Sequence, residues 1–475
     1  MLKIRISLTY VFLAFMILSV KAESVTLKEL QDTGLMLLII DTEGQENPRC
    51  EYVEAPEGSI GRGITDNDEV SGRLRVILYE NLLYDSKEYE EGKSGMTIRV
   101  RGNSSAWTEK KPYKIKLQKK ADLLFRGDDD YKDKSWLLIK DSESMTLKNE
   151  MSLKPLVGLK ISELIGMEWT PSGRYVNLVL NDAYMGIYFL IESVKESKKR
   201  VNLSKDTGFL IEYDPYWWNE DISFDTDYTS SLFKFTFKEP DDDNITDEFL
   251  TYVNSTMLVV ENSLEDNTFI NTIDLESFAK WMLAMDILGS DDAGGVNKFL
   301  YKFDSSNSSL VKMGPLWDFD GIMKKHDSFS EIHTLDLFNF YYSNLLKKNR
   351  FVKTYSDLWN KIKDTIFIKL YEYLDDFAES EYGKSLNSAR YFEKEIWNED
   401  YKSVDDNINE IKMYFDNRYT WLTNALNEIE ISAEYIKRIP NKENNKTVIF
   451  DLLGRITLHP NGFYIQDGVL KHTKF

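Results

Sequence analysis

The stretch that says most about the fold is residues 99–117, which read RVRGNSSAWTEKKPYKIKL. Gly, Asn and Ser in Arg101–Ser105 favour a turn-forming loop. The residues before it, Met96–Val100, are rich in strand formers, and those after it, Tyr113–Leu117, alternate between apolar and basic side chains. Successive side chains of a strand point to opposite faces, so Lys114 should face away from the apolar side. The segment therefore predicts a strand, a polar glycine loop and a lysine-bearing strand.

The flanking sequence of the first half is also mostly β in pattern. Further strands are predicted at Leu35–Ile40, Leu74–Leu78 and Trp136–Ile139, and a hairpin is predicted from Tyr175–Leu180 and Met185–Ile191. Asn181-Asp182 supplies the residues that a two-residue hairpin turn prefers. One helix is expected, over Leu147–Leu164, despite Pro155.

The second half changes to helical periodicity. Asp274 is placed to cap a helix that runs to about Leu288. Two strand-like runs follow, Lys298–Phe303 and Val311–Leu316, and the region Leu335–Ile429 is aromatic-rich and helical in period. The pattern predicts an α+β protein, with a β-rich first part and a helix-rich second part.

Composition excludes several classes of protein. The chain has 475 residues, of which 42% are apolar and 29% charged, so a folded globular protein is expected. Its net charge of −20 argues against nucleic acid as a partner. A single cysteine excludes internal disulfides, and the four histidines show no zinc-ligand spacing. Any bound metal should therefore be a hard cation held by oxygen atoms.

The N-terminus has the features of a secretory signal peptide. Lys3 and Arg5 precede the apolar run Val11–Val20, and Ala22 supplies a small residue for cleavage. Residues 1–22 are predicted to be removed, which implies a secreted or cell-surface protein; a buried N-terminal helix is the alternative. No later stretch reaches the ~18 apolar residues of a membrane span.

Candidate catalytic side chains concentrate in residues 292–320. Asp292 and Asn297 stand five residues apart, which is the spacing of the base and the metal-binding Asn in a protein-kinase catalytic loop. Asp318 follows after two predicted strands, where a metal-binding carboxylate is expected, and Asp320 is its near neighbour. Taken singly, each of these residues also fits a capped helix end or an ordinary turn.

Five motifs together resemble the CotH kinase family, which is named for a spore-coat protein kinase. They are Arg99–Trp107, Lys110–Leu117, Trp136–Asp141, Gly186–Glu192 and Pro315–Asp320. The resemblance covers about residues 35–425. It implies an atypical, two-lobed kinase-like domain over 23–430, with a β-rich lobe to about 195 and a helical lobe from about 270. It also implies transfer of the γ-phosphate of ATP, with Mg²⁺ or Mn²⁺, to Ser or Thr of extracellular or surface proteins.

Carried over by motif, the resemblance assigns roles to individual residues. The catalytic carboxylate would be Asp292, and the metal would be held by Asp318, Asn297 and Asp320. The nucleotide would be bound by Lys114 or Lys111, with Lys114 preferred by strand alternation, and by Arg101, Gly102, Asn103, Ser104, Lys148 and Glu192. An exposed strand lysine and a solvated strand end are the plain alternatives for Lys114 and Glu192.

Two departures from the family pattern leave a second function open. Lys148 stands where members usually carry Arg, and Ala293-Gly-Gly-Val296 surrounds the catalytic position in place of aromatic or polar residues. Lysine keeps the charge and loses the bidentate fork of arginine. A catalytically weak or dead surface adhesin or structural module is therefore the alternative to an active kinase.

The last segment, residues 441–475, is predicted to form a small β unit. Val448–Ile456 and Asn461–Gly468 are two strand-like runs around turn residues. The segment resembles the C-terminal sorting domains of exported Bacteroidetes proteins, which implies delivery to the cell surface or medium. A terminal hairpin that packs on the main domain is the alternative.

Overall fold

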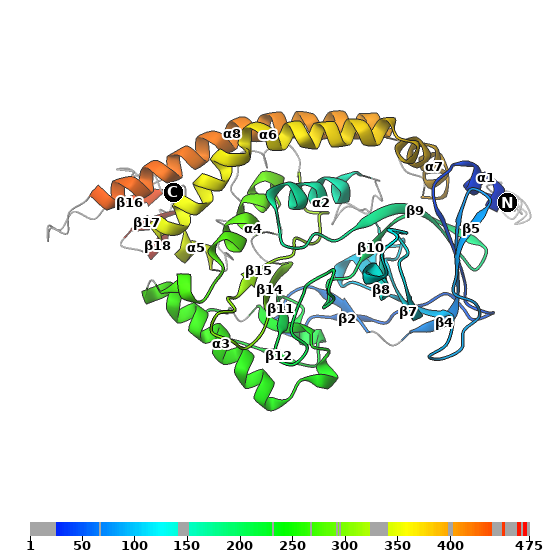
Figure 1. The fold of residues 1–475 in the computed structure, drawn as a ribbon, viewed down its shortest axis with the longest axis horizontal. Helices are drawn as coiled ribbons and strands as arrows, with labels where there is room; N and C mark the ends of the chain where they lie inside the picture. Colours follow the sequence, from blue (N-terminus) through cyan, green and yellow to red (C-terminus); the bar gives the residue numbers. More distant parts are fainter. Residues whose placement is uncertain are drawn as a thin grey trace, which may run out of the picture.

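The computed structural model describes residues 25–65, 68–140, 152–229, 232–266, 268–290, 293, 296–323, 341–397, 402–438, 449–451, 463–466 and 469–472, with backbone alone after residue 427. The predicted α+β class is confirmed: the N-terminal region is rich in sheet and the C-terminal region is helical (Figure 1). No helix of the described part is long and apolar enough to cross a membrane.

The N-terminal region is built on an eight-stranded sheet that closes on itself. Its strands are β1 (Leu37–Asp41), β4 (Val70–Leu78), β5 (Asn81–Asp85), β6 (Met96–Val100), β7 (Tyr113–Ala121), β8 (Asp133–Ile139), β9 (Gly173–Leu180) and β10 (Ala183–Glu192). The order is β1-β9-β10-β8-β7-β6-β4-β5, and β1 pairs with β9 on one edge and with β4 on the other. This second pairing removes the open edge that β1 would otherwise present.

Alternation along the strands fills the interior of this closed sheet. Leu38, Ile98, Ile115, Trp136 and Leu178 are each completely buried there. In β7 the pattern is the predicted one, with Tyr113, Ile115 and Leu117 buried and Lys114 on the opposite, half-buried face. Burial of such side chains contributes about 1.5–3 kcal/mol each, which is why the register of β7 is firmly specified.

The predicted hairpin is confirmed, and the predicted helix is shorter than expected. β9 and β10 pair in antiparallel register, and Asn181 and Asp182 at the turn have φ of 48° and 63°. Helix α2 spans Lys154–Ile165, with Pro155 in its first turn, where the missing N–H costs no intrahelical bond. Residues 147–151 of the predicted helix lie outside the described part.

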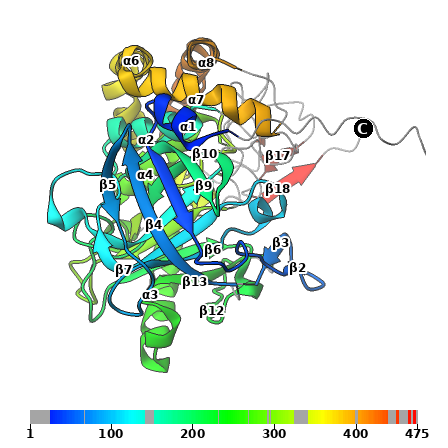
Figure 2. The same cartoon turned by 90° about the vertical axis from the view of Figure 1, so that its right-hand side faces the viewer.

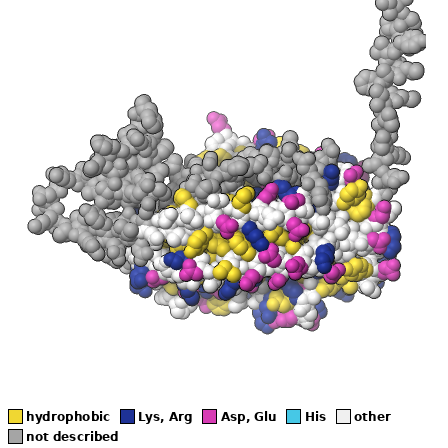
Figure 3. All heavy atoms as spheres, turned by 90° about the horizontal axis from the view of Figure 1, so that it is seen from above, with side chains coloured by type: hydrophobic (Ala, Val, Ile, Leu, Met, Phe, Trp, Pro, Cys, Tyr) yellow, Lys and Arg dark blue, Asp and Glu magenta, His cyan; other side chains and the backbone are white. Residues whose placement is uncertain are grey.

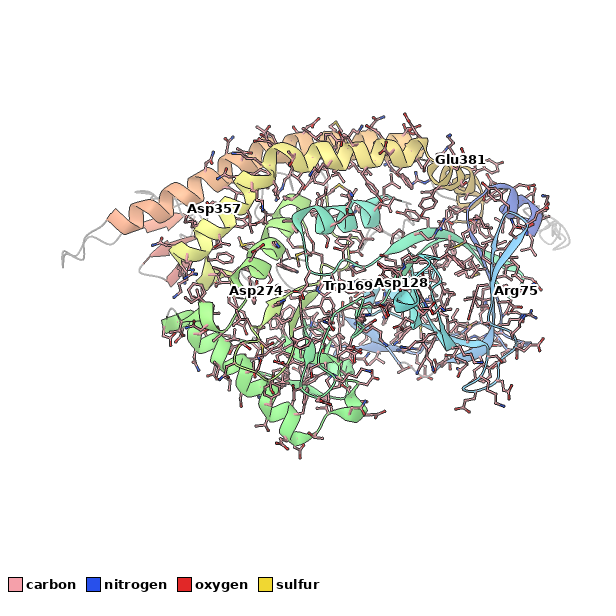
Figure 4. The ribbon with its side chains drawn as sticks, in the orientation of Figure 1. Arg75, Asp128, Trp169, Asp274, Asp357 and Glu381 are labelled. Carbon is pink, nitrogen blue, oxygen red and sulfur yellow. The ribbon has the colours of Figure 1, made fainter. Side chains whose placement is uncertain are left out.

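A second sheet follows, with strand order β12-β13-β11-β14-β15. Its strands are β11 (Phe209–Asp214), β12 (Ser223–Phe224), β13 (Lys234–Glu239), β14 (Lys298–Lys302) and β15 (Lys312–Met313). Helix α4 (Leu275–Leu288) begins as predicted at Asp274, labelled in Figure 4, whose carboxylate accepts a hydrogen bond from the Ser277 N–H at 2.9 Å. Helix α3 (Asp247–Asp266) was not expected from the sequence pattern.

The helical layer lies along one side of the molecule. It consists of α5 (Tyr342–Leu345), α6 (Asn349–Glu379), α7 (Glu381–Trp397) and α8 (Val404–Arg438). Figure 2 shows α6 and α8 almost end-on above the sheets, with α3 at the opposite side. α6 packs on α2, α4 and α8 through buried residues such as Trp359 and Leu370. On the face in Figure 3, acidic and basic side chains are interspersed. Helix α6 carries an exposed ion pair of its own, Lys353–Asp357, at 3.0 Å.

Smaller elements complete the described part. Helix α1 (Leu27–Asp32) packs Leu30 against Leu37 and Ile39 of β1. A hairpin of β2 (Tyr52–Glu54) and β3 (Arg62–Ile64) stands outside the large sheet. Near the C-terminus, β16 (Ile449–Asp451), β17 (Phe463–Gln466) and β18 (Val469–His472) form a three-stranded antiparallel sheet.

Candidate functional site

The polar glycine loop connects β6 to β7. Gly102 has φ of +85°, and a Cβ at this position would lie 2.4 Å from the Ser105 hydroxyl. The loop continues into a single 3₁₀ turn, Ser104–Trp107. Because only glycine adopts this geometry without strain, the backbone of the loop can approach a ligand closely.

Basic side chains gather on the outer face of β6 and β7, beside this loop. Arg99 and Lys114 are directly opposite each other in the register of the two strands. Burial, together with the positive charges of Arg99, Arg101, Lys116 and Lys195, lowers the pKa of Lys114 to about 8. Like charges placed opposite one another destabilise a sheet, so this arrangement favours a site that receives an anion.

The two candidate lysines occupy different surroundings. Lys111 donates hydrogen bonds to the Tyr52 hydroxyl at 2.5 Å and to the Ala106 carbonyl at 2.8 Å, and its ammonium lies over the Tyr52 ring. The ammonium of Lys114 forms no hydrogen bond or ion pair with any residue that the structure describes. Of the two, Lys114 is thus the one available to an added anion.

The candidate metal ligands lie at one end of the β14–β15 hairpin. Asn297 immediately precedes β14, and Asp318 follows β15, so antiparallel pairing brings both to the same end. Both have φ of +59°, which is uncommon outside glycine and recurs at functional sites. Asp318 is exposed between Trp317 and Phe319, which are 8% and 5% exposed. The two buried aromatics therefore fix the outward direction of the carboxylate.

This end of the hairpin lies near the glycine loop. Burial lowers the pKa of Arg101, and the carboxylates of Asp318 and Glu212 lie close enough to oppose that change. Burial also raises the pKa of Glu212 to about 7, although Lys238, 2.9 Å away, opposes this increase. The candidate anion site therefore lies near the candidate oxygen ligands for a cation.

Helix α2 supports the segment that carries Asp318. The Lys154 ammonium donates to the Asp320 carbonyl at 2.8 Å. Gly158 lies beneath the Phe319 ring, so closely that a Cβ there would come within 2.1 Å of it. Asp320 itself is half-buried. Helix α2 therefore stabilises the backbone on the C-terminal side of Asp318.

Glu192 interacts with a different set of residues. Its side chain is 1% exposed and forms ion pairs with Arg126 at 2.9 Å and Arg200 at 3.5 Å. It also accepts the backbone N–H of Ser172 at 2.9 Å. A solvated strand end is therefore wrong for this residue, and its carboxylate is already engaged within the protein.

Two of the sequence-predicted residues cannot be placed. Asp292 and Lys148 lie outside the described residues. Within the described ranges, no group of three or more His, Cys, Asp or Glu side chains forms a metal cluster. Of the candidate cation ligands, Asn297, Asp318 and Asp320 lie within the described residues, and their side chains carry oxygen atoms of the kind that hard cations prefer.

Two basic residues of the cluster were not among the predicted site residues. Arg99 could have been found, because it is two residues before Arg101 and shares its strand face under period-2 alternation. Lys195 could not, because it reaches Lys114 only through the packing of the segment after β10. The cationic groups and the adjacent oxygen donors together fit a polyphosphate with a divalent cation.

Comparison with protein families relates the chain to a known family. The sequence model of the family described as CotH kinase protein matches residues 98–422, which is more than half of the chain. The matched range contains the glycine loop, the basic cluster and the β14–β15 hairpin. No curated protein matches the chain.

Proposed function

The chain belongs to the CotH kinase protein family, and we propose that it transfers the γ-phosphate of ATP to Ser or Thr of proteins outside the cell or at its surface. The observation that carries the proposal is the group of Arg99, Arg101 and Lys114 beside Asp318. Use of ATP and a divalent cation is general in kinases.

In this proposal the chain's residues have separate tasks. Lys114 and Arg101 bind the phosphates, and the backbone of Gly102–Ser104 approaches them closely. Asp318, Asn297 and Asp320 hold Mg²⁺ or Mn²⁺. The cation, when bound, neutralises negative charge on the β- and γ-phosphates.

Asp292 is proposed as the base. It accepts the proton of the acceptor hydroxyl while the new bond from the acceptor oxygen to phosphorus forms and the bond from phosphorus to ADP breaks. The kinase-like arrangement of two lobes, a β-rich one to about residue 195 and a helical one from about residue 270, belongs to the same proposal. Export directed by residues 1–22, with residues 441–475 as a sorting segment, is also part of it.

A catalytically weak or dead surface module is the second candidate. Two departures from the usual family pattern favour it: Lys148 stands in place of Arg, and the small residues Ala293-Gly-Gly-Val296 follow the proposed catalytic Asp292. Such a module would bind nucleotide weakly or not at all, and its retained charges would serve no chemistry.

Thermal unfolding with ATP, with metal and with both separates these candidates. A ligand that binds only the native state raises stability by RT ln(1 + [L]/Kd), about 2.7 kcal/mol at one hundred times Kd. An active kinase should show a melting temperature that rises with ATP and metal together more than with either alone. A melting temperature unchanged by any combination would contradict the proposed function and favour the binding module.

A further inference from the structure

The β2–β3 hairpin lies between the glycine loop and the second sheet. We call residues 52–64 the strap. In Figure 2 its strands appear beside β6, β12 and β13. The strap contacts the Ser104–Trp107 turn on one side and, through two hydrogen bonds, a 3₁₀ turn at Trp217–Asn219 on the other. The second turn follows β11 of the smaller sheet, so the strap joins the two sheet regions at the candidate site.

On the side of the glycine loop, the strap is held by Trp107. The Trp107 indole N–H donates to the Gly63 carbonyl at 3.2 Å. The ring centroids of Trp107 and Tyr52 are 4.6 Å apart, and the Arg62 guanidinium lies 4.8 Å above the Trp107 ring. These contacts tie both strands of the strap to the turn that ends the loop.

On the side of the second sheet, the strap makes two hydrogen bonds and one close packing contact. The Trp218 indole N–H donates to the Ile60 carbonyl at 3.0 Å, and the Asn219 amide donates to the Ile64 carbonyl at 2.9 Å. Gly61 packs on the Tyr216 ring so closely that a Cβ would lie 2.3 Å from it. Both hydrogen bonds are accepted by backbone carbonyls of the strap, so they do not depend on the identity of the strap's side chains.

Tyr216 also contacts the loop directly. Its hydroxyl lies 2.9 Å from the Ser104 hydroxyl, within hydrogen-bond distance. Its backbone N–H donates to the carboxylate of Asp214, at 2.7 Å, and Asp214 is 3% exposed at the end of β11. Ser104 is therefore linked through Tyr216 to a buried group of the second sheet.

We propose that Tyr216 and Asn219 are positioning residues that, with the strap, hold the Arg101–Ser104 loop in its phosphate-binding conformation before the nucleotide arrives. A short loop that contains glycine has many accessible conformations, and ordering it on binding would reduce affinity. Contacts from the strap and from Tyr216 already order the loop in the free protein, so less conformational entropy is lost when the nucleotide binds. The benefit for nucleotide binding rests on the proposed function, whereas the ordering of the loop can be measured in the protein without nucleotide.

The test compares Tyr216→Phe, and the double variant Tyr216→Phe/Asn219→Ala, with wild type. Tyr371→Phe is the matched control, because it removes a hydroxyl that bonds the Lys412 carbonyl and Asp416 in the helical layer, far from the loop. Amide hydrogen exchange of residues 101–107 is measured without nucleotide, and the Kd of ATP with Mg²⁺ by calorimetry. A lost neutral hydrogen bond corresponds to about a two- to tenfold change, so exchange should accelerate and affinity fall by that factor.

The control variant should leave both quantities at their wild-type values. Unchanged exchange of residues 101–107 in the double variant would overturn the inference. Because exchange is measured without nucleotide, it decides the role of the strap even if the wild-type chain binds no ATP. If the wild type binds no ATP but exchange is faster in the variants, the proposed function is contradicted, whereas the role of Tyr216, Asn219 and the strap in ordering the loop is supported.

Discussion

The ammonium of Lys110 and the carboxylate of Glu393, 283 residues apart in the chain, form a buried ion pair between the segment before β7 and helix α7. Their side chains are 1% and 2% exposed. Lys110 also donates to the Ile187 carbonyl at 2.7 Å, and Glu393 accepts the Ile187 N–H at 2.6 Å. The pair thus braces β10 where its register with β9 shifts, and it connects the large sheet to the helical layer.

Removal of one partner of this pair should be costly. Lys110→Ala leaves the Glu393 carboxylate buried without its counter-charge, and breaking a buried pair in this way costs about 3–5 kcal/mol. Replacing both residues, in Lys110→Met/Glu393→Leu, should recover most of that loss. Urea unfolding of the three proteins measures it, and a free energy of unfolding within about 1 kcal/mol of wild type for Lys110→Ala would contradict the prediction.

Lys114→Ala should weaken binding of ATP without disturbing the fold. Lys114 faces away from the buried side of β7, so it contributes charge to the basic cluster and little packing. Lys111→Ala is the matched control, since Lys111 is bound to Tyr52 and the Ala106 carbonyl. Calorimetry decides between them: a loss in Lys111→Ala with none in Lys114→Ala would assign the nucleotide to the other lysine.

The low pKa of Lys114 predicts a dependence of stability on pH. The folded group releases its proton near pH 8, whereas the unfolded one keeps it to about 10.5. Between these values the unfolded chain binds more protons, so this lysine makes stability rise with pH. Lys114→Met should therefore be more stable than wild type at pH 7, and the difference should shrink toward pH 10.5. A difference independent of pH, measured by urea unfolding, would show that the lysine is not perturbed.

Asp318→Ala should abolish metal-dependent binding of ATP. This exposed carboxylate, aimed outward between two buried aromatics, is the proposed ligand that joins the cation to the site. Chelation by EDTA should have the same effect on the wild-type chain. Asp320→Ala is the comparison, and unchanged ATP affinity in Asp318→Ala with metal present would move the role to Asp320 or remove the metal site.

Asp292→Asn should act on the chemical step and hardly on binding. The change keeps the shape and removes the charge, and a catalytic base contributes about 10²–10⁴ in rate. Transfer of labelled phosphate should fall by that factor while the Kd of ATP stays within about threefold, less than the change expected from one lost hydrogen bond to a charged group.

Asp291→Asn is the control for that experiment, because it is adjacent but outside the five-residue spacing to Asn297. Asp286, on the preceding helix, would be a poor control. It is completely buried, its carboxylate accepts the Tyr355 hydroxyl at 2.5 Å, and its carbonyl accepts Arg418 at 2.6 Å. Equal losses from Asp291→Asn would show that the spacing argument is wrong, and undiminished transfer in Asp292→Asn would reject this loop as catalytic.

Local patterns were enough to predict several elements of this chain. The alternation of Tyr113–Leu117, the turn at Asn181-Asp182 and the cap at Asp274 each depend on neighbouring residues alone, and the structure confirms all three. Helix α3 was not predicted, although its first turn carries Asp247 and Glu248. Its buried apolar residues, Val253, Met257, Val260 and Leu264, do recur at helical spacing.

The candidate site itself required the tertiary structure. The sequence by itself determined that a lysine strand, a glycine loop and acidic residues near 292–320 exist, and which strand face Lys114 occupies. Only folding decided that Lys195 lies near Lys114, that Arg101 lies near Asp318, and that the Tyr216 hydroxyl is within hydrogen-bond distance of Ser104. These residues are far apart in the chain, and closure of the large sheet and docking of the second sheet bring them together. No local periodicity encodes such contacts, because they depend on how whole elements pack.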